Sequence, residues 1–242
     1  MVYGGRSKWI DLSQRKYPNT NWIIFIGVEP TEDFPDYWEE INEKIKVLEN
    51  QQKGFPESDR IKYNYINLDF ANDLVRLIRY FRALITFVYK QGYFIKCNLT
   101  SGIFEIRISL FLASQIESEK ISEIFYINKQ TYKTNLLTKS FNISKKGETL
   151  LKIIYNENII KIKNKNHPLE YNLTDLSIIS KNNEFKIDLP GISRLVSNLV
   201  EDGFLKERRE GRKKYVSLTK TGLMFCPVKD LQDIIKNDIN RI

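Results

Sequence analysis

Apolar segments of strand length alternate with amphipathic segments of helix length between residues 22 and 128, and this alternation constrains the fold most strongly. Residues 22–28 are a continuous apolar run, as expected for a strand that is covered on both faces, and residues 61–68 are a second strand candidate enriched in Tyr and Ile. Residues 36–50 and 72–89 repeat apolar side chains at helical spacing. Strands that alternate with helices form mostly parallel sheets, so we predict an α/β fold for this part of the chain.

The third repeat of this pattern contains a polar turn that we predict to be functional. An apolar run at residues 93–97 is followed by a turn of five residues, after which residues 103–118 have the spacing of a helix; the turn consists of Asn98, Leu99, Thr100, Ser101 and Gly102. Open α/β sheets bind ligands at the carboxyl ends of their strands, and the unpaired amides of a helix start can hold a phosphate. Thr, Ser and Gly are also common in such turns simply because they cap helices. No GxGxxG motif is present in the sequence, so the usual dinucleotide-binding fingerprint is excluded.

The charge of the chain is concentrated in its second part. Residues 141–242 contain 19 Lys and Arg against 13 Asp and Glu, a net of +6 out of the total of +8. An asymmetry of this kind indicates a polyanionic partner for the second part, and a solvated lysine-rich surface is the alternative.

The cysteine and apolar content excludes several classes of protein. Cys97 and Cys226 lie far apart and have no CxxC partner, so we expect neither a disulfide framework nor a metal site, and we expect a cytoplasmic location. The longest apolar stretches fall well short of the roughly 20 residues needed to cross a bilayer. No signal-peptide pattern opens the chain. We therefore expect no membrane partner, no metal and no tightly bound cofactor.

A polar segment separates this α/β part from a second region with its own pattern. We predict a first domain at residues 1–130, a linker at 131–143 and a second domain at 144–242 that includes a C-terminal helix. Within the second domain, residues 144–156, 174–180 and 189–202 have helical spacing. Two basic strands then flank Glu210, Gly211 and Arg212, which indicates a β-hairpin.

The second region resembles the winged helix-turn-helix transcription factors of the MarR and ArsR kind. The resemblance rests on residues 192–205, on the basic hairpin, and on the sequence Leu218-Thr-Lys-Thr-Gly222. It implies double-stranded DNA as the partner, with a recognition helix in the major groove and a wing on the adjacent phosphates. The predicted DNA-contacting residues of the helix and of the wing are Ser193, Arg194, Ser197, Asn198, Lys206, Arg208, Arg209, Arg212, Lys213 and Lys214.

The first region resembles the sensor domains of the CRISPR-associated Rossmann-fold (CARF) family. The resemblance rests on the turn from Asn98 to Gly102, which is similar to the family's Asn/Asp-Leu-Thr-Gly-Gly-Thr turn, and on the pairing with a winged helix, which is an architecture of archaeal regulators of CRISPR loci. It implies a Rossmann-like sheet of six strands, a homodimer, and cyclic oligoadenylate, most plausibly cyclic tetra-adenylate, as the effector bound across the dimer. The ligand residues that it implies are Gly4, Gly5, Arg6, Ser7, Asn98, Leu99, Thr100, Ser101 and Gly102.

Three alternatives to a ligand-sensing DNA-binding regulator remain open from the sequence. The first is a ring nuclease that cleaves the cyclic ligand, for which Ser7, Lys8, Thr100 and Ser101 supply hydroxyls and a cation. The second is a DNA-binding regulator whose sensor has lost its ligand, and the third is a winged helix that contacts protein. The single histidine, His167, precedes a proline in a polar segment, and we interpret it as a loop residue rather than a catalytic one.

Overall fold

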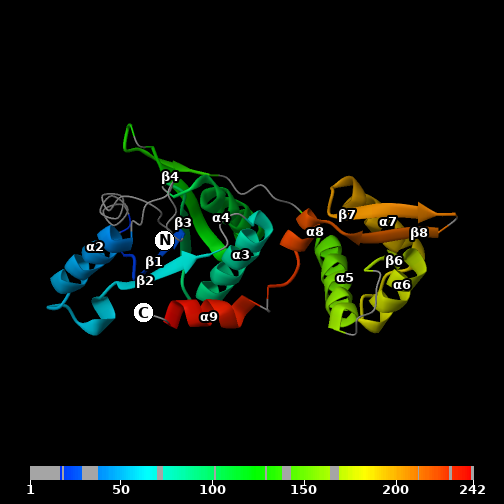
Figure 1. The fold of residues 1–242 in the computed structure, drawn as a ribbon, viewed down its shortest axis with the longest axis horizontal. Helices are drawn as coiled ribbons and strands as arrows, with labels where there is room; N and C mark the ends of the chain where they lie inside the picture. Colours follow the sequence, from blue (N-terminus) through cyan, green and yellow to red (C-terminus); the bar gives the residue numbers. More distant parts are fainter. Residues whose placement is uncertain are drawn as a thin grey trace. The chain divides into compact units, whose positions relative to one another are not determined.

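A computed structural model of the 242-residue chain describes residues 17, 19–28, 38–69, 73–100, 102–128, 130–137, 143–163, 169–211, 213–228 and 231–240. The chain divides into two compact units (Figure 1). The first combines Met1–Ser140 with Val228–Ile242, and the second is Phe141–Pro227. The second unit is therefore an insertion in the chain of the first.

The first unit contains two sets of hydrogen-bonded strands. Strands β1 (Trp22–Val28) and β2 (Lys62–Leu68) pair in parallel, and β3 (Ile95–Asn98) pairs in parallel with β4 (Ile121–Ile127). The short strand β5 (Thr134–Leu136) adds to β4 in the antiparallel direction. Within the described residues, no strand pairing joins the two sets. The mixed α/β architecture with parallel pairing confirms the coarse fold prediction, whereas the described residues do not form one continuous sheet.

Helices cover the strands as their apolar spacing predicts. Helix α2 (Trp38–Gln51) packs Ile41, Ile45 and Leu48 against alternate residues of β1, Ile23 and Phe25. The intervening β1 residues are also buried, so the strand is covered on both faces. The remaining helical elements up to β4 are the 3-10 turns η1 (Glu57–Asp59) and η2 (Ser118–Lys120) and the helices α3 (Leu74–Lys90) and α4 (Phe104–Ile116).

The limits of α3 follow from its terminal residues. Asp73 accepts a hydrogen bond from the amide of Arg76 at 3.0 Å and so caps the first turn. Beyond the last turn, Gly92 has a φ of +84°, a backbone conformation that a side chain disfavours. The helix therefore occupies the segment that its sequence predicts to within about two residues at each end.

The C-terminal helix α9 (Gln232–Asn240) belongs to the first unit, which differs from the predicted domain boundary at residues 144–242. The Tyr80 hydroxyl donates to Asp238 Oδ2 at 2.7 Å, and the Asn64 side-chain amide donates to the carbonyl of Ile239 at 2.8 Å. Ile235 and Ile239 are buried. The apolar face of this helix is thus covered by α3 and β2, which lie far away in the sequence.

The segment predicted as a linker also contains structure. Residues 131–143 include β5, in which Leu136 lies opposite Phe125 of β4. The strand lies at the edge of its sheet and is only three residues long. A short, partly exposed edge strand has no alternation of apolar and polar residues, so the polar sequence of this segment did not predict a strand.

The second unit is a set of helices beside a small antiparallel sheet. In chain order its elements are α5 (Lys145–Lys163), β6 (Tyr171–Asn172), α6 (Leu173–Asn182), α7 (Leu189–Glu201), β7 (Leu205–Glu210), β8 (Lys213–Leu218) and α8 (Lys220–Met224). The strand order is β6-β8-β7. Helix α5 continues to residue 163, beyond the predicted end of this helix at residue 156, and His167 lies outside the described residues.

The Leu218-Thr-Lys-Thr-Gly222 sequence has a clear structural role in this unit. The Thr219 hydroxyl donates to the carbonyls of Gly203 and Phe204 at 2.7 and 3.0 Å, and it accepts from the amide of Gly222 at 3.0 Å. A Cβ atom at position 222 would lie 2.2 Å from the Phe204 carbonyl oxygen. Glycine is required there because α8 approaches the backbone at the start of the hairpin.

None of the helices in the described part of the chain has the length and apolar content that a membrane crossing requires.

Candidate functional site

Helix α7 presents a polar face to solvent and an apolar face to the core. Asp188 caps the helix by accepting from the amide of Gly191 at 2.9 Å. Ile192, Val196 and Leu199 are buried in the second unit. The opposite face carries the predicted DNA-contacting residues of the helix: Arg194, Ser197 and Asn198 are exposed, and Ser193 is half-buried.

The predicted DNA-contacting residues of α7 differ in whether their side chains already form hydrogen bonds within the helix. The Ser197 hydroxyl donates to the Ser193 carbonyl at 3.0 Å, within the helix. Ser197 is therefore partly used by its own backbone. Arg194 and Asn198 lie one turn apart on the exposed face, and their side chains can form the bidentate contacts that read base edges.

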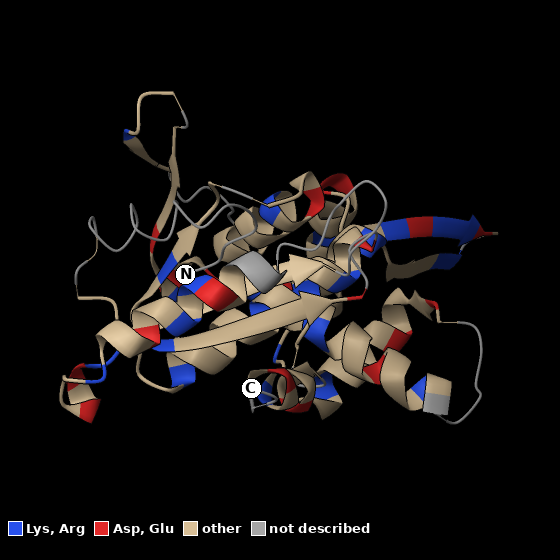
Figure 2. Cartoon of the chain, turned by 60° about the vertical axis from the view of Figure 1, so that its left-hand side comes forward, with Lys and Arg blue, Asp and Glu red and all other residues tan. Residues whose placement is uncertain are grey.

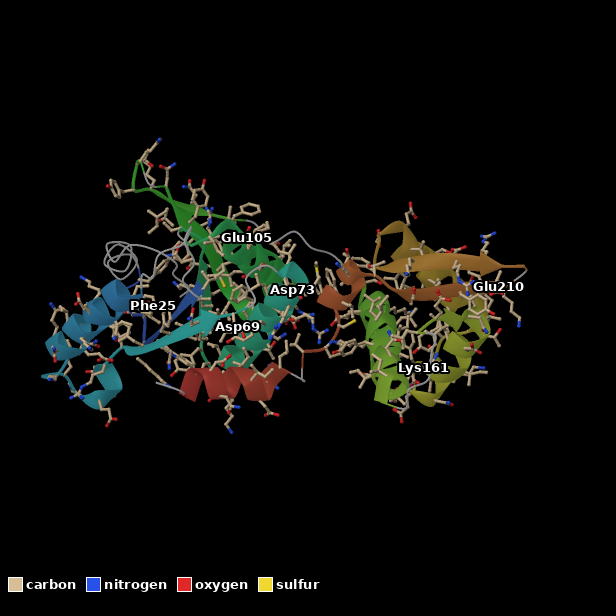
Figure 3. All side chains as sticks on the ribbon, in the orientation of Figure 1. Phe25, Asp69, Asp73, Glu105, Lys161 and Glu210 are labelled. Carbon is tan, nitrogen blue, oxygen red and sulfur yellow. The ribbon has the colours of Figure 1, made fainter. Side chains whose placement is uncertain are left out.

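The hairpin that follows α7 brings the predicted wing residues onto two adjacent strands. Strands β7 and β8 pair from Leu205 opposite Leu218 to Glu210 opposite Lys213. Glu210 lies near the tip of the hairpin (Figure 3). The basic residues of the two strands are interrupted by acidic ones, as Figure 2 shows. The strands together carry five cations, Lys206, Arg208, Arg209, Lys213 and Lys214, against the two carboxylates of Glu207 and Glu210.

Three of these cations form ion pairs within the unit. The Arg208 guanidinium lies 2.9 Å from Glu170 and 3.2 Å from Glu210. Arg209 and Lys214 both reach Glu207, at 2.8 and 2.7 Å. The wing is therefore a network of paired charges rather than a simple row of free cations.

Two pKa shifts have their cause in this network. Hydrogen bonds from Lys214 and Arg209 hold the pKa of Glu207 below its usual value. Hydrogen bonds to Glu170 and Glu210 raise the pKa of Arg208. The charged forms of these groups are thus favoured at neutral pH, and a phosphate that approaches the arginines has to displace carboxylates.

Lys206 and Lys213 are the cations of the two strands that remain available. Both are exposed, and neither forms an ion pair with a residue that the structure describes. Arg212, which was also predicted to contact DNA, lies outside the described residues. The two lysines extend from paired strands of one hairpin, Lys206 opposite Ser217 and Lys213 opposite Glu210, and their ammonium groups can contact phosphates.

The Asn98–Thr100 turn of the first unit is buried and hydrogen-bonded to itself. Asn98 is 1% exposed and Thr100 is 4% exposed. The Asn98 side chain accepts from both the amide, at 2.9 Å, and the hydroxyl of Thr100, and the Thr100 hydroxyl accepts from the amide of Ile127 at 2.8 Å. Both side chains thus fix the turn against β4, and Thr100 also lines the cavity beside α4.

The start of α4 is the part of this turn that remains open to a ligand. Its N-cap residue, Ile103, makes no side-chain capping bond, and Gly102 precedes it with a φ of +103°. A cavity of about 530 Å³ lies beside this helix and the half-buried Leu99, lined in part by Phe104, Arg107 and Phe111. The amides of the first turn have no partner within the helix, so they can donate hydrogen bonds to an anion there.

Acidic residues oppose an anion at this edge. Asp69 follows β2, Asp73 precedes α3 and Glu105 lies in the first turn of α4, and all three are exposed (Figure 3). Gly4, Gly5, Arg6, Ser7 and Ser101, the other predicted ligand residues, lie outside the described residues, and so does Lys8. The described groups at this edge therefore combine an aromatic wall and one cation, Arg107, with three exposed carboxylates.

The aromatic wall of this cavity was missed from the sequence. Phe104 of α4 is 65% exposed, and Tyr126 of β4, which also lines the cavity, is exposed as well. Phe104 and Phe111 lie two turns apart within an apolar helix, and this spacing is typical of a buried face. Their exposure was a matter of tertiary packing, since α3 covers the other side of α4.

No metal-binding cluster of three or more His, Cys, Asp or Glu side chains occurs among the described residues.

Comparisons with known proteins give little further information. No protein-family model matches the chain. No curated protein matches it either. The crystal structure of protein VC1899 from Vibrio cholerae is similar with a TM-score of 0.43 and 11% sequence identity; the match covers 98% of this chain, which spans 64% of the length of VC1899. At this level of similarity, the function has to be inferred from the chain's own residues.

Proposed function

We propose that the protein is a DNA-binding transcriptional regulator whose second unit is a winged helix-turn-helix. The observation that carries the proposal is the exposed polar face of α7 followed directly by a hairpin with an excess of cations. The order α5, α6, α7, β7, β8 is the order of elements in a winged helix. In that arrangement α7 enters the major groove and the hairpin contacts the adjacent backbone.

The structure suggests separate roles for the residues of the interface. Arg194 and Asn198 have the donors and acceptors that base edges require. Lys206 and Lys213 contribute phosphate contacts, which give affinity without sequence preference. Arg208 and Arg209 contribute less than the lysines, because each is already paired with a carboxylate.

We further propose that the first unit is a Rossmann-like CARF sensor of a CRISPR-associated regulator. Its ligand is a cyclic oligoadenylate, cyclic tetra-adenylate, which binds across a homodimer at the carboxyl ends of β3 and β4. The uncapped start of α4 and the aromatic cavity beside it support this site. The ligand would act on DNA binding through its different affinity for two arrangements of the winged helices.

The DNA-binding proposal is tested by salt-dependent titration of a duplex with matched double variants. We expect Lys206→Ala with Lys213→Ala to weaken binding to all duplexes and to reduce the slope of log K against log salt concentration by about 2. Arg208→Ala with Arg209→Ala should also reduce the slope, but by less. Equal slopes for the lysine variant and the wild type would refute the role of the hairpin.

The sensor proposal is tested by calorimetric titration of the purified full-length chain with cyclic tetra-adenylate, followed by recovery of the ligand. One intact ligand bound per dimer supports a sensor. Linear products place the chain among the ring nucleases. The absence of binding leaves a DNA-binding regulator without this effector.

A further inference from the structure

A second cavity of the first unit lies at the opposite ends of its strands. It has a volume of about 650 Å³ and is lined by the first residues of β1 and β3, by Ser122 and Glu123 of β4 and by the end of α3. The Asn98–Thr100 turn lies where β3 and β4 end. A seven-residue strand such as β4 spans roughly 20 Å, so the two cavities are distinct.

Aromatic side chains form much of the wall of this cavity. The rings of Trp22 and Tyr93 meet edge to face, with centroids 5.1 Å apart. Tyr17 lines another part of the wall. Phe94 is 91% exposed, so its ring makes little contact with the unit although it borders the cavity. A planar ligand would find both a fixed aromatic wall and an exposed ring that can stack on it.

The charged groups in the wall neutralise one another. Lys96 lies 3.0 Å from Glu123, and the Tyr17 hydroxyl donates to the same carboxylate at 2.6 Å. Burial and the hydrogen bond to Glu123 raise the pKa of Tyr17, so the hydroxyl remains a donor at neutral pH. An anionic ligand would have to compete with Glu123 for the ammonium group of Lys96.

Cationic ligands are also disfavoured, because each of two aromatic rings of the wall already has a lysine ammonium group over it. The Lys96 ammonium lies 3.9 Å from the centre of the Tyr17 ring, and the Lys62 ammonium lies 4.7 Å from the centre of the Trp22 ring. A ligand cation would repel both lysines. The chemistry of the wall therefore selects an uncharged ligand.

Polar side chains remain available to orient such a ligand. Asn19 and Asn21 are exposed at the rim, and their side-chain amides form no hydrogen bond with residues that the structure describes. An amide offers a donor and an acceptor side by side, which matches the edge of a nucleobase. The volume also lies within the range of small-molecule sites.

From these features we infer that the cavity at the amino ends of β1, β3 and β4 binds an uncharged planar heterocycle of the nucleobase or nucleoside class. The ring stacks between the Trp22–Tyr93 wall and Phe94, and Asn19 and Asn21 bind its polar edge. This site is independent of the effector site proposed at the other ends of the strands.

The inference is tested by titrating the full-length chain with adenosine and following the ligand by saturation-transfer NMR and calorimetry. We expect binding to the wild type and about tenfold weaker binding to Phe94→Ala, because one aromatic stacking partner is lost. Phe104→Ala is the matched control, since Phe104 is also exposed but borders the other cavity. It should bind adenosine like the wild type.

Three results would overturn the inference. The first is the absence of adenosine binding to the wild type. The second is loss of binding in Phe104→Ala with binding retained in Phe94→Ala, which would place adenosine at the other cavity. The third is tighter binding of adenosine monophosphate than of adenosine, which would show that the wall prefers an anion. Because Phe94→Ala leaves the Asn98–Thr100 turn and α4 unchanged, the titration with cyclic tetra-adenylate tests the effector site separately.

Discussion

Each of the two units contains an arginine–glutamate ion pair, one buried and the other exposed. In the first unit, Arg82 and Glu117 meet at 2.7 Å with side chains that are only 6% exposed. In the second, Arg208 and Glu170 meet at 2.9 Å, with exposures of 52% and 22%. A buried pair is hard to separate, because a charge left behind is poorly solvated, whereas an exposed pair exchanges partners at little cost. The first pair fixes structure, and the second can give way to a phosphate.

The largest effect that this comparison predicts is the loss of the buried carboxylate. Burial alone would raise the pKa of Glu117, but Arg82 and Lys120 more than offset it, so its pKa lies below the usual value. Glu117→Gln removes the charge that faces Arg82 and should lower the free energy of unfolding by about 3–5 kcal/mol. Chemical denaturation followed by circular dichroism measures this change.

The control for this variant is Glu119→Gln. Glu119 is 85% exposed, lies in the same turn and is 3.9 Å from Lys120, so its loss should change stability by less than about 1 kcal/mol.

The pKa shift of Glu117 also fixes the sign of the pH dependence of stability. The lowered pKa of Glu117 stabilises the fold above the unfolded-state value of about 4.3, and this contribution is lost as the pH falls through the folded-state value. The stability curves of the wild type and of Glu117→Gln, plotted against pH, should therefore converge below about pH 4. A constant difference between them down to pH 2 would contradict the ionic origin of the effect.

The assignment of α9 to the first unit predicts the next effect. Ile235 is buried and its neighbour Ile234 is 46% exposed. Ile235→Ala should destabilise the first unit by about 3 kcal/mol, because it leaves a cavity beneath α9, and Ile234→Ala should have little effect. Hydrogen exchange measures the change: amides of α3 and β2 should exchange faster while those of α6 and α7 are unchanged. Faster exchange in α6 and α7 alone would place α9 with the second unit.

The smallest predicted effect on stability is that of a substitution in the hairpin, and this substitution should change DNA affinity more than it changes stability. Glu207 binds both Lys214 and Arg209 at the surface of the hairpin. Glu207→Gln should change the free energy of unfolding by less than about 1 kcal/mol and should strengthen DNA binding, because two cations become available to phosphates. The duplex titration described above measures this, and weaker binding would mean that Glu207 orients the two cations for the DNA.

Local patterns predicted most elements, because each is stabilised by residues within it. The apolar run at residues 22–28 became β1, and the spacing in residues 189–202 became α7 with Asp188 as its cap. The polar strand β5 and the continuation of α5 beyond residue 156 were not predicted. Both depend on contacts outside the segment itself, because β5 pairs with β4 and Lys161 of α5 lies over the ring of Tyr171.

The candidate sites divide in the same way. The exposed face of α7 and the basic hairpin were predicted residue by residue, because helical and strand periodicity place side chains on defined faces. The burial of Asn98 and Thr100 was not predicted, since the sequence of a polar turn is the same whether its side chains face solvent or β4. The cavity of Trp22, Tyr93 and Lys96 was also not predicted, because its wall combines segments that are separated by about seventy residues.

The sequence by itself determined the mixed α/β class, the bounds of most helices and strands, and the excess of cations in the second part of the chain. Only the tertiary structure decided which charges are paired, where α9 packs and which polar side chains are buried. The physical reason is that periodicity and capping act over a few residues, whereas ion pairs such as Arg82 with Glu117 and contacts such as Tyr80 with Asp238 join residues that only the fold brings together.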